Sequence, residues 1–236
     1  MGLFGKLTTD GMEEVQDRVG SGSQPLESDI YEATIVAPYV THSASGAMAV
    51  NLIAKIGERE YRETFYVTNR EGKNYYLNQN NKKCPLPGFN TINDICLITT
   101  EQPLSEQDTE DKVLKLYDFE TKSEVNKTVP VISALMGKKV ALGILKRIEN
   151  KRVKEGDTYV DSAESRTFNA IDKVFHPELH VTVPEAVHGK EAVFWDKWLE
   201  ANKGKTQDRR KIKDGEAHQA RKPAAAPAPK KSLFGR

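Results

Sequence analysis

Apolar and polar residues alternate in three successive segments of this chain, and this alternation constrains the fold more than any other feature. In residues 47–56 the apolar positions are Met48, Val50, Leu52, Ala54 and Ile56. A period of two residues is that of a half-buried strand. Residues 29–41 and 59–68 alternate in the same way, and the intervening segments 42–46 and 57–58 are typical of turns. The sequence therefore predicts three consecutive antiparallel strands, with Pro38 favouring an edge position or a bulge in the first.

Further strands and a helix are predicted in the middle of the chain. Residues 89–100 can form a helix whose apolar side chains face the body of the protein: Ile92, Ile95, Cys96 and Leu97. A short turn or helix is expected at 133–137 and a polar hairpin loop at 154–165. Strands are expected in four segments: 113–119, 128–131, 138–151 and 166–175.

Residues 190–202 are typical of an amphipathic helix, because Val193, Phe194, Trp198 and Leu199 form one apolar stripe. The pattern as a whole predicts a mainly β protein: an antiparallel barrel with a helix between its strands, a packed C-terminal helix and a disordered basic tail. We expect three parts: a lead-in at 1–28 with a short helix over 10–19, a folded domain at 29–202, and a Pro/Ala-rich tail at 203–236.

The formal net charge of +1 conceals an uneven distribution. Residues 203–236 hold 11 Lys/Arg and three Asp/Glu, so the first 202 residues retain 24 basic and 31 acidic side chains. A body that is about seven charges negative does not attract a nucleic acid through its overall field. If the body binds such a polymer, a local strip of basic residues has to do so.

Composition excludes several classes of protein. At 236 residues and 38% hydrophobic content, the chain fits one domain with extensions. Two cysteines, Cys84 and Cys96, are too few for a disulfide framework, so free thiols are expected. No apolar run is long enough to cross a bilayer, and the first residues lack the apolar core of a secretory signal. We therefore expect a cytoplasmic protein without membrane contact.

No constellation of catalytic residues is found in the sequence. The segment MGKK at 136–139 lacks the first glycine and the Ser/Thr of a phosphate-binding loop, and no nucleophile elbow or zinc-protease motif is present. His176 and His180 lie four residues apart, but Pro177 favours a turn rather than a metal-binding helix. We expect a protein that is not an enzyme and that needs no cofactor or metal.

Aromatic and basic residues are interleaved between residues 59 and 76, which read REYRETFYVTNREGKNYY. This stretch holds five aromatic and four Arg/Lys residues. Rings on which bases stack, with cations that meet phosphates, suit a single-stranded nucleic acid. An ordinary solvated strand face has similar residues, and aromatic residues are also favoured in strands for packing alone. Tyr61 and Phe65 share one face and Arg62 and Tyr66 the other, but the sequence leaves open which face is inward.

The order of three strands, a helix and further strands resembles the phage-encoded single-stranded DNA-binding proteins with an OB-fold. Four segments carry the resemblance: YEATIVAPYVTHSASGAMAVNLIAKI at 31–56, ETFYVTNREGKNYY at 63–76, GKKVALGILKRIENK at 137–151 and RTFNAIDKVF at 166–175. The resemblance covers residues 29–180. It implies sequence-independent coating and protection of single-stranded DNA during replication, recombination and repair of phage DNA, in the cytoplasm of an infected bacterial cell.

The C-terminal tail departs from that family, many members of which end in an acidic tail with a terminal aromatic. Here the tail is basic and ends in SLFGR, so that Leu233 and Phe234 are expected to bind a partner. Leu3, Phe4 and Gly5 repeat the LFG motif near the start. Phage replication enzymes or host RNA polymerase are the expected partners, and a homo-oligomer stays open. The alternatives are an OB-fold adaptor for other proteins, or an RNA-binding or transcription-activating protein that acts through these terminal peptides.

The predicted nucleic-acid-binding residues fall into two kinds. Those expected to stack on bases are Tyr61, Tyr66, Tyr75, Tyr76 and Phe168, with Phe65 assigned to the core. Those expected to contact phosphates are Arg62, Arg70, Lys73, Lys82, Lys83, Lys146, Arg147, Lys151, Arg152 and Arg166.

Overall fold

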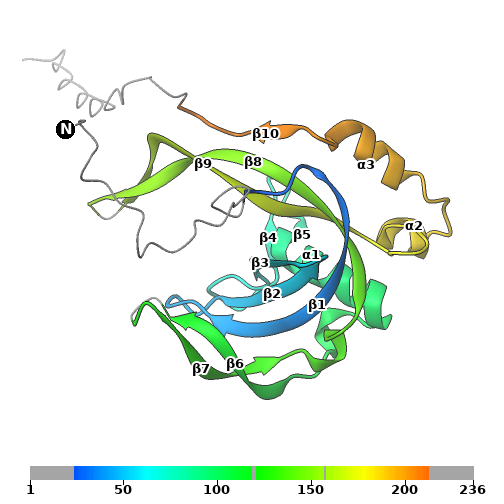
Figure 1. The fold of residues 1–236 in the computed structure, drawn as a ribbon, viewed down its shortest axis with the longest axis horizontal. Coiled ribbons are helices and arrows are strands. Elements are labelled where there is room, and N and C mark those ends of the chain that lie inside the picture. The colour runs from blue at the N-terminus through cyan, green and yellow to red at the C-terminus, as the bar shows by residue number, and fades with distance from the viewer. Residues whose placement is uncertain (1–23, 119–120, 157, 213–236) are drawn as a thin grey trace, which may run out of the picture.

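The computed structural model describes residues 24–118, 121–156 and 158–212 (Figure 1). The expected helix over 10–19 and the expected partner-binding residues Leu233 and Phe234 lie outside these ranges. Within them the protein is mainly β, with an antiparallel sheet and few helices, as predicted.

Three consecutive strands start the fold. They are β1 (Asp29–His42), β2 (Met48–Ile56) and β3 (Arg59–Tyr66), and each pairs antiparallel with the next. A bulge between Ile35 and Ala37 bends β1. Because of this bend, the first half of β1 pairs with β8 (Lys139–Glu155) and the second half with β2. The expected meander is confirmed, and the irregularity lies beside Pro38.

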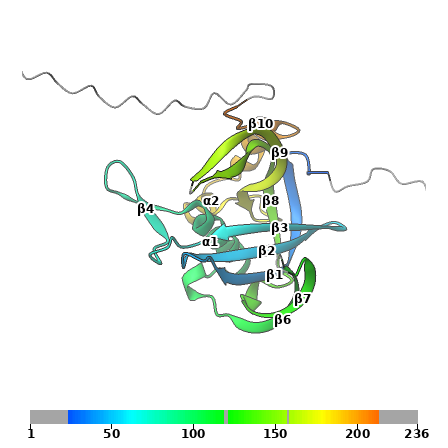
Figure 2. The ribbon, with the colours of Figure 1, turned by 90° about the vertical axis from the view of Figure 1, so that its left-hand side faces the viewer.

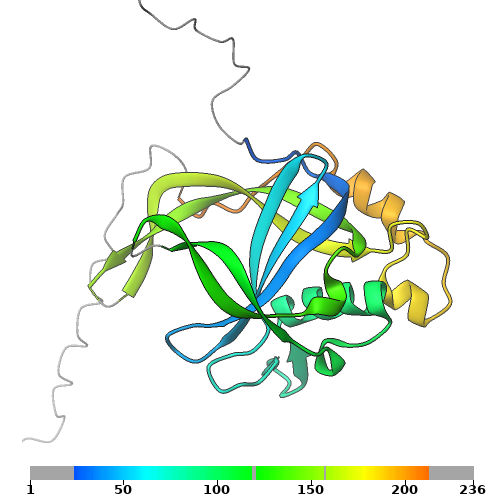
Figure 3. The same ribbon diagram turned by 60° about the horizontal axis from the view of Figure 1, so that its bottom comes forward.

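The longest strands form one antiparallel hairpin, β8 and β9 (Thr158–Phe175). Their ladder continues to the pair Glu155 and Thr158, so the polar hairpin loop predicted at 154–165 is wrong. Most of that segment is strand, because cross-strand pairing continues after the body has ended. We call residues 150–165 the β8–β9 arm; it projects from the body in Figures 1 and 3.

Two smaller hairpins complete the β structure. The strands β6 (Glu110–Asp118) and β7 (Ser123–Val131) pair with each other and join the sheet where Tyr39 of β1 faces Val131. β7 contains the strand predicted at 128–131 and begins earlier. β6 covers residues 113–118 of the strand predicted at 113–119 and begins three residues earlier, and residue 119 lies outside the described ranges. The strands β4 (Tyr75–Leu77) and β5 (Lys83–Pro85) form a separate two-stranded sheet that stands off from the body (Figure 2).

The predicted helix after β5 is confirmed as α1 (Pro87–Thr100), and it closes the main core. Ile92, Ile95 and Cys96 are buried among residues of β1, β2, β3, β8 and β9, whereas Leu97, expected to face the body, is only half-buried. At Gly88 the first turn of α1 lies so close to β3 that a Cβ would meet the Tyr66 carbonyl oxygen at 2.5 Å. Short 3-10 helices follow at Leu104–Glu106 and, as expected, at Ser133–Leu135. Both cysteines are free, as predicted.

A second, smaller core lies on the outer side of β8. The helices here are α2 (Val183–Val187) and α3 (Phe194–Asn202). Trp198 of α3 packs against Ala141, Leu145 and Phe175, and its Nε1 donates to Asp172 at 2.9 Å. The predicted helix therefore packs as expected, but it begins at Phe194, and Val193 is exposed rather than part of the stripe.

The folded body extends past residue 202, so the prediction that the disordered tail begins at 203 is wrong for residues 203–212. The short strand β10 (Thr206–Asp208) pairs parallel with β8 from Lys146 to Ile148. Beyond it, the Asn150 side chain accepts from the backbone N–H of Lys211 and of Ile212. Pairing to a distant strand holds this polar segment, and its own composition gives no sign of it.

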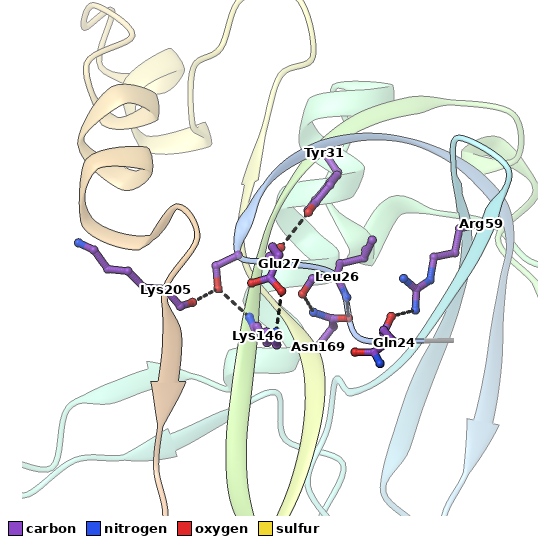
Figure 4. A network of polar contacts seen from close by, with 9 residues as sticks. Gln24, Leu26, Glu27, Tyr31, Arg59, Lys146, Asn169 and Lys205 are labelled. Atoms are coloured by element: carbon purple, nitrogen blue, oxygen red, sulfur yellow. Dashed lines mark hydrogen bonds and ion pairs between the residues drawn. The ribbon is translucent and has the colours of Figure 1, made fainter. Parts of the chain in front are cut away.

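The end of the predicted lead-in also belongs to the body (Figure 4). The Asn169 side chain exchanges two hydrogen bonds with the backbone of Leu26. The buried Ser28 hydroxyl donates to the Lys205 carbonyl and accepts from the Lys146 backbone N–H. Residues 24–28 thus tie β8, β9 and the segment before β10 together.

The sheet does not close into a barrel within the described ranges. Its order is β10-β8-β1-β2-β3, with β9 paired to β8, and no ladder joins β3 to β9 there. A side chain bridges the two instead: the Glu63 carboxylate on β3 accepts from the Ile171 backbone N–H on β9 at 2.8 Å.

Candidate nucleic-acid interface

The two tyrosines of β3 have opposite positions. Tyr66 is 53% exposed, as its predicted role requires. Tyr61 is only 7% exposed, lies in the main core with Phe65, and donates its hydroxyl to Glu63 Oε2 at 2.6 Å. The prediction that Tyr61 stacks on bases is therefore wrong for this structure. Residues 61, 63 and 65 share a strand face by parity, and that face is the inward one.

A hollow of about 500 Å³ opens beside the unpaired edge of β3. We call it the β3–β9 hollow. Tyr66 and Glu63 of β3, Pro87 of α1, Arg147 of β8 and Ile171 of β9 contribute to its lining. It therefore brings together Tyr66 and Arg147, two predicted residues that lie 81 positions apart in the chain.

The hollow combines an apolar wall with one carboxylate. Phe65 and Ile171 are among the apolar residues, and Glu63 supplies the carboxylate. Its Oε2 accepts from Tyr61 and from Ile171, whereas Oε1 has no hydrogen-bond partner among the described residues. Burial raises the pKa of Glu63, and the hydrogen bonds from Tyr61 and Ile171 and the charge of Arg147 limit this rise.

Two side chains outside the hollow, Gln207 and Asp172, fix the position of the Arg147 guanidinium. Its Nε donates to Gln207 Oε1 at 2.8 Å, and its Nη2 lies 3.5 Å from Asp172 Oδ1. Its side chain is 15% exposed, and burial lowers its pKa. The guanidinium therefore lines the hollow in a fixed position with part of its charge compensated. Gln207 belongs to β10, so the segment predicted as tail helps to place Arg147.

The β4–β5 segment lies at one end of this hollow and carries much of the predicted interface. Lys83 Nζ lies 4.5 Å from the centre of the Tyr75 ring, and Tyr76 is 50% exposed. Arg70 and Lys82 are exposed, as predicted, whereas Lys73 forms an ion pair with Glu71 at 2.8 Å. Thr68, Asn69 and Leu86, which flank the segment, also line the hollow.

The β8–β9 arm and the residues next to it on β8 and β9 carry the second group of predicted residues. The Arg166 guanidinium lies 4.9 Å from the centre of the Phe168 ring, and that of Arg152 lies 6.0 Å from the Tyr159 ring. Acidic neighbours compensate these cations: Glu149 with Arg166, Asp161 with Arg152, and Glu164 with Lys151. Each such exposed pair contributes little to stability and can exchange for a phosphate.

A basic hollow of about 390 Å³ lies at the root of the arm. Two of its cations were predicted, Arg152 and Arg166, and two were missed, Arg209 and Lys211. The sequence does not indicate Arg209 and Lys211, because the polar, basic composition around them is typical of a disordered tail, and it does not indicate Tyr159, because the polar residues around it are typical of a loop. Thr158, Tyr159 and Val160 are strand-favouring residues, and they were the signal available.

The last two predicted cations differ: Lys146 has a structural role, whereas Arg62 belongs to an exposed ion pair outside the hollow. Lys146 Nζ pairs with Glu27 at 2.6 Å, and its side chain is 23% exposed, within the network that holds residues 24–28 (Figure 4). Arg62 pairs with Glu60 at 2.5 Å on the outer face of β3. Most of the predicted residues thus fall into two groups, one around the β4–β5 segment next to the β3–β9 hollow and one at the root of the arm, while Lys146 packs in the network around residues 24–28.

Two kinds of site are not found in the part of the chain that the structure describes. No group of three or more His, Cys, Asp or Glu side chains is placed to hold a metal ion there. None of the described helices combines the length and the apolar character needed to cross a membrane. Comparison with protein-family models, with curated proteins and with solved structures gives no match.

Proposed function

We propose that this protein binds single-stranded DNA, and that it is a phage-encoded coating protein acting in replication, recombination and repair. The observation that carries the proposal is that exposed Tyr66 and fixed Arg147 line one hollow, although they come from distant strands. A ring beside a cation accommodates a base and its phosphate without reading the sequence. The DNA would run from the β4–β5 segment, past the β3–β9 hollow, to the β8–β9 arm.

The strand order supports an OB-fold for the central part of the chain. An OB-fold is a five-stranded, partly open barrel that binds oligonucleotides on one face. Here β9, β8, β1, β2 and β3 are neighbours in that order, the bent β1 is shared by both halves, and α1 lies between β3 and β8 in sequence. We propose that the gap between β3 and β9, bridged by Glu63, is the opening of such a barrel.

The charges of the interface indicate binding that is moderate and sensitive to salt. Several of its cations already have acidic partners, and the first 202 residues are net negative. Phosphates have to displace those partners, so electrostatic attraction alone is weak and stacking has to supply much of the free energy. A stacked ring contributes roughly 1–3 kcal/mol.

Fluorescence anisotropy with labelled thymidine oligomers tests the proposal. We expect Tyr66→Ala to weaken binding by about 5- to 100-fold, the equivalent of one lost stacking contact. Tyr117→Ala is the matched control, because Tyr117 is also exposed, at 47%, but lies on the β6–β7 hairpin. Equal affinity of wild type and Tyr66→Ala would overturn the proposed path. Duplex DNA and RNA of equal length, titrated in parallel, separate the proposal from an RNA-binding function.

A role for the termini is a separate proposal. We propose that Leu233 and Phe234 bind a replication enzyme or the host RNA polymerase, since two apolar residues end a basic, Pro/Ala-rich segment. A chain that ends at residue 212 should keep its DNA affinity and lose the partner. Loss of DNA binding in that chain would instead assign the binding to the tail.

A further inference from the structure

We propose that the β3–β9 hollow receives one nucleobase and that Glu63 selects a base with N–H donors on its pairing edge, guanine above all and thymine least. This inference rests on the proposed function, because it assumes that single-stranded DNA passes the hollow. It adds a base preference to a protein whose other contacts are tolerant of sequence.

The first step is the size and character of the hollow. Its volume of about 500 Å³ falls within the range of pockets that take small ligands, roughly 300–1,000 Å³. Phe65, Ile171 and Pro87 give it apolar surface, and Tyr66 adds a ring at its border. A flat heterocycle that leaves the stack can therefore exchange water for apolar contact here.

The second step is the state of the Glu63 carboxylate. A carboxylate offers about four acceptor positions. Tyr61 and Ile171 occupy two of them at Oε2, and Oε1 has no partner in the described part of the chain. Oε1 is not among the buried side-chain acceptors that lack a partner, so water can reach it, and a ligand that brings N–H groups can take the place of that water.

The third step is the chemistry of the four bases. Guanine presents two adjacent donors, N1–H and the 2-amino group, beside its O6 acceptor. Cytosine and adenine present one amino group each, whereas thymine presents one N–H between two carbonyl oxygens, which a carboxylate repels. Arg147 lines the same hollow, and guanidinium donates readily to guanine O6. The pair Glu63 and Arg147 thus complements guanine best.

A purely structural role for Glu63 is the alternative, because the same carboxylate joins β3 to β9. The variant Glu63→Gln separates the two roles. A glutamine oxygen still accepts from Tyr61 and Ile171, so the bridge remains, but its amide nitrogen meets an incoming base as a donor. Glu60→Gln is the matched control, since Glu60 lies on the outer face of β3, paired with Arg62 and outside the hollow.

The test compares a labelled thymidine oligomer of roughly 12 nucleotides, within the site size of such folds, with the same oligomer carrying one central guanine. A single guanine avoids four-stranded structures. We expect wild type and Glu60→Gln to bind the guanine oligomer about 5- to 10-fold more tightly, at the lower end of the discrimination of one good base contact. We expect Glu63→Gln to bind both oligomers within about twofold of each other, the loss of that contact.

A change in the DNA keeps the proposal testable if Glu63→Gln does not fold. Hypoxanthine in place of guanine lacks the 2-amino group, so wild type should lose part of its preference for the substituted oligomer. Equal binding of the thymidine and guanine oligomers by wild type, or an unchanged preference in Glu63→Gln, overturns this inference and leaves the proposed function standing. Failure to bind either oligomer overturns both.

Discussion

Glu63 Oε2 on β3 accepts the backbone N–H of Ile171 on β9 at 2.8 Å, and this bond spans the one place where the central sheet would have to pair to become a barrel. Ile171 lies at a register shift in the β8–β9 ladder, where Gly143 faces Lys173 and Ile144 faces Ile171. In the described part of the chain β9 pairs only with β8, so the Ile171 N–H, which faces the other side of β9, has no ladder partner. The carboxylate supplies that partner, and it also accepts from the buried Tyr61 hydroxyl.

The first prediction concerns this bridge. Glu63→Ala leaves the Tyr61 hydroxyl and the Ile171 N–H without acceptors. Each buried donor without a hydrogen-bond partner lowers the free energy of unfolding by roughly 1–3 kcal/mol. We expect the free energy of unfolding to fall by about 2–4 kcal/mol. Urea unfolding followed by tryptophan fluorescence measures it. Glu63→Gln keeps an acceptor, so its free energy of unfolding should fall by less than half as much. An equal loss in both variants would show that the negative charge of Glu63, and not its hydrogen bonds, stabilises the folded protein.

The second prediction concerns pH. Burial raises the pKa of Asp94 on α1 from 3.8 to about 6, while Lys173 and the Asn90 amide partly oppose the rise. The folded protein therefore binds the Asp94 proton more tightly than the unfolded chain does. The resulting stability is fully present below about pH 3.8 and is lost as the pH rises through about 6.

Asp94→Asn should remove this dependence. At pH 7 we expect its free energy of unfolding to exceed that of wild type by roughly 1–3 kcal/mol, and at pH 4 the difference should become small. Urea titrations at several pH values measure both. Asp196→Asn, at an exposed carboxylate of α3, is the control and should follow wild type. A gain of the Asp94 variant that is the same at pH 4 and pH 7 would contradict the assigned titration.

The third prediction concerns salt. Arg166 lies over Phe168, is 61% exposed, and has only a 4.0 Å contact with Glu149, so a phosphate can replace that carboxylate. Arg166→Gln should weaken binding to thymidine oligomers several-fold at low salt. It should also reduce the slope of log K against log salt by about 0.7, the value for one phosphate contact on a single strand.

Anisotropy titrations between low and moderate salt give that slope. Lys139→Gln is the control, because Lys139 lies at the other end of β8 and pairs with Glu32. An unchanged slope in Arg166→Gln would place the base of the arm outside the DNA path.

The fourth prediction concerns the C-terminal boundary. A chain that ends at residue 212 keeps β10 and the partners of Asn150, so its stability should equal that of the full chain. A chain that ends at residue 203 loses β10 and the Lys205 carbonyl, the acceptor of the buried Ser28 hydroxyl. We expect the second chain to lose roughly 2–4 kcal/mol, from several hydrogen bonds at about 1 kcal/mol each. Thermal unfolding compares the two, and equal midpoints would contradict the boundary seen here.

The spacing of apolar residues along the chain was sufficient to predict much of the fold. The alternation of Val50, Leu52 and Ala54 predicts a strand with one apolar face, and these side chains are buried; Ile53 on the other face is buried as well, in a core with Leu116 of β6. Ile92, Ile95 and Cys96 recur at helical spacing and are buried on α1. Such features depend on neighbours within a few residues, so the sequence alone determines them.

Only the tertiary structure decided the rest. Which face of β3 points inward, and hence the fates of Tyr61 and Tyr66, depends on register against β2 and on the position of α1, because both faces carry aromatic residues. The pairing of β10 with β8, the ion pair of Lys146 with Glu27 and the hydrogen bond of Glu63 with Ile171 join segments from 60 to 119 residues apart. Contacts between segments so far apart produce no periodic pattern in the sequence of either segment. They depend on the surface that each segment presents to the other after both have folded.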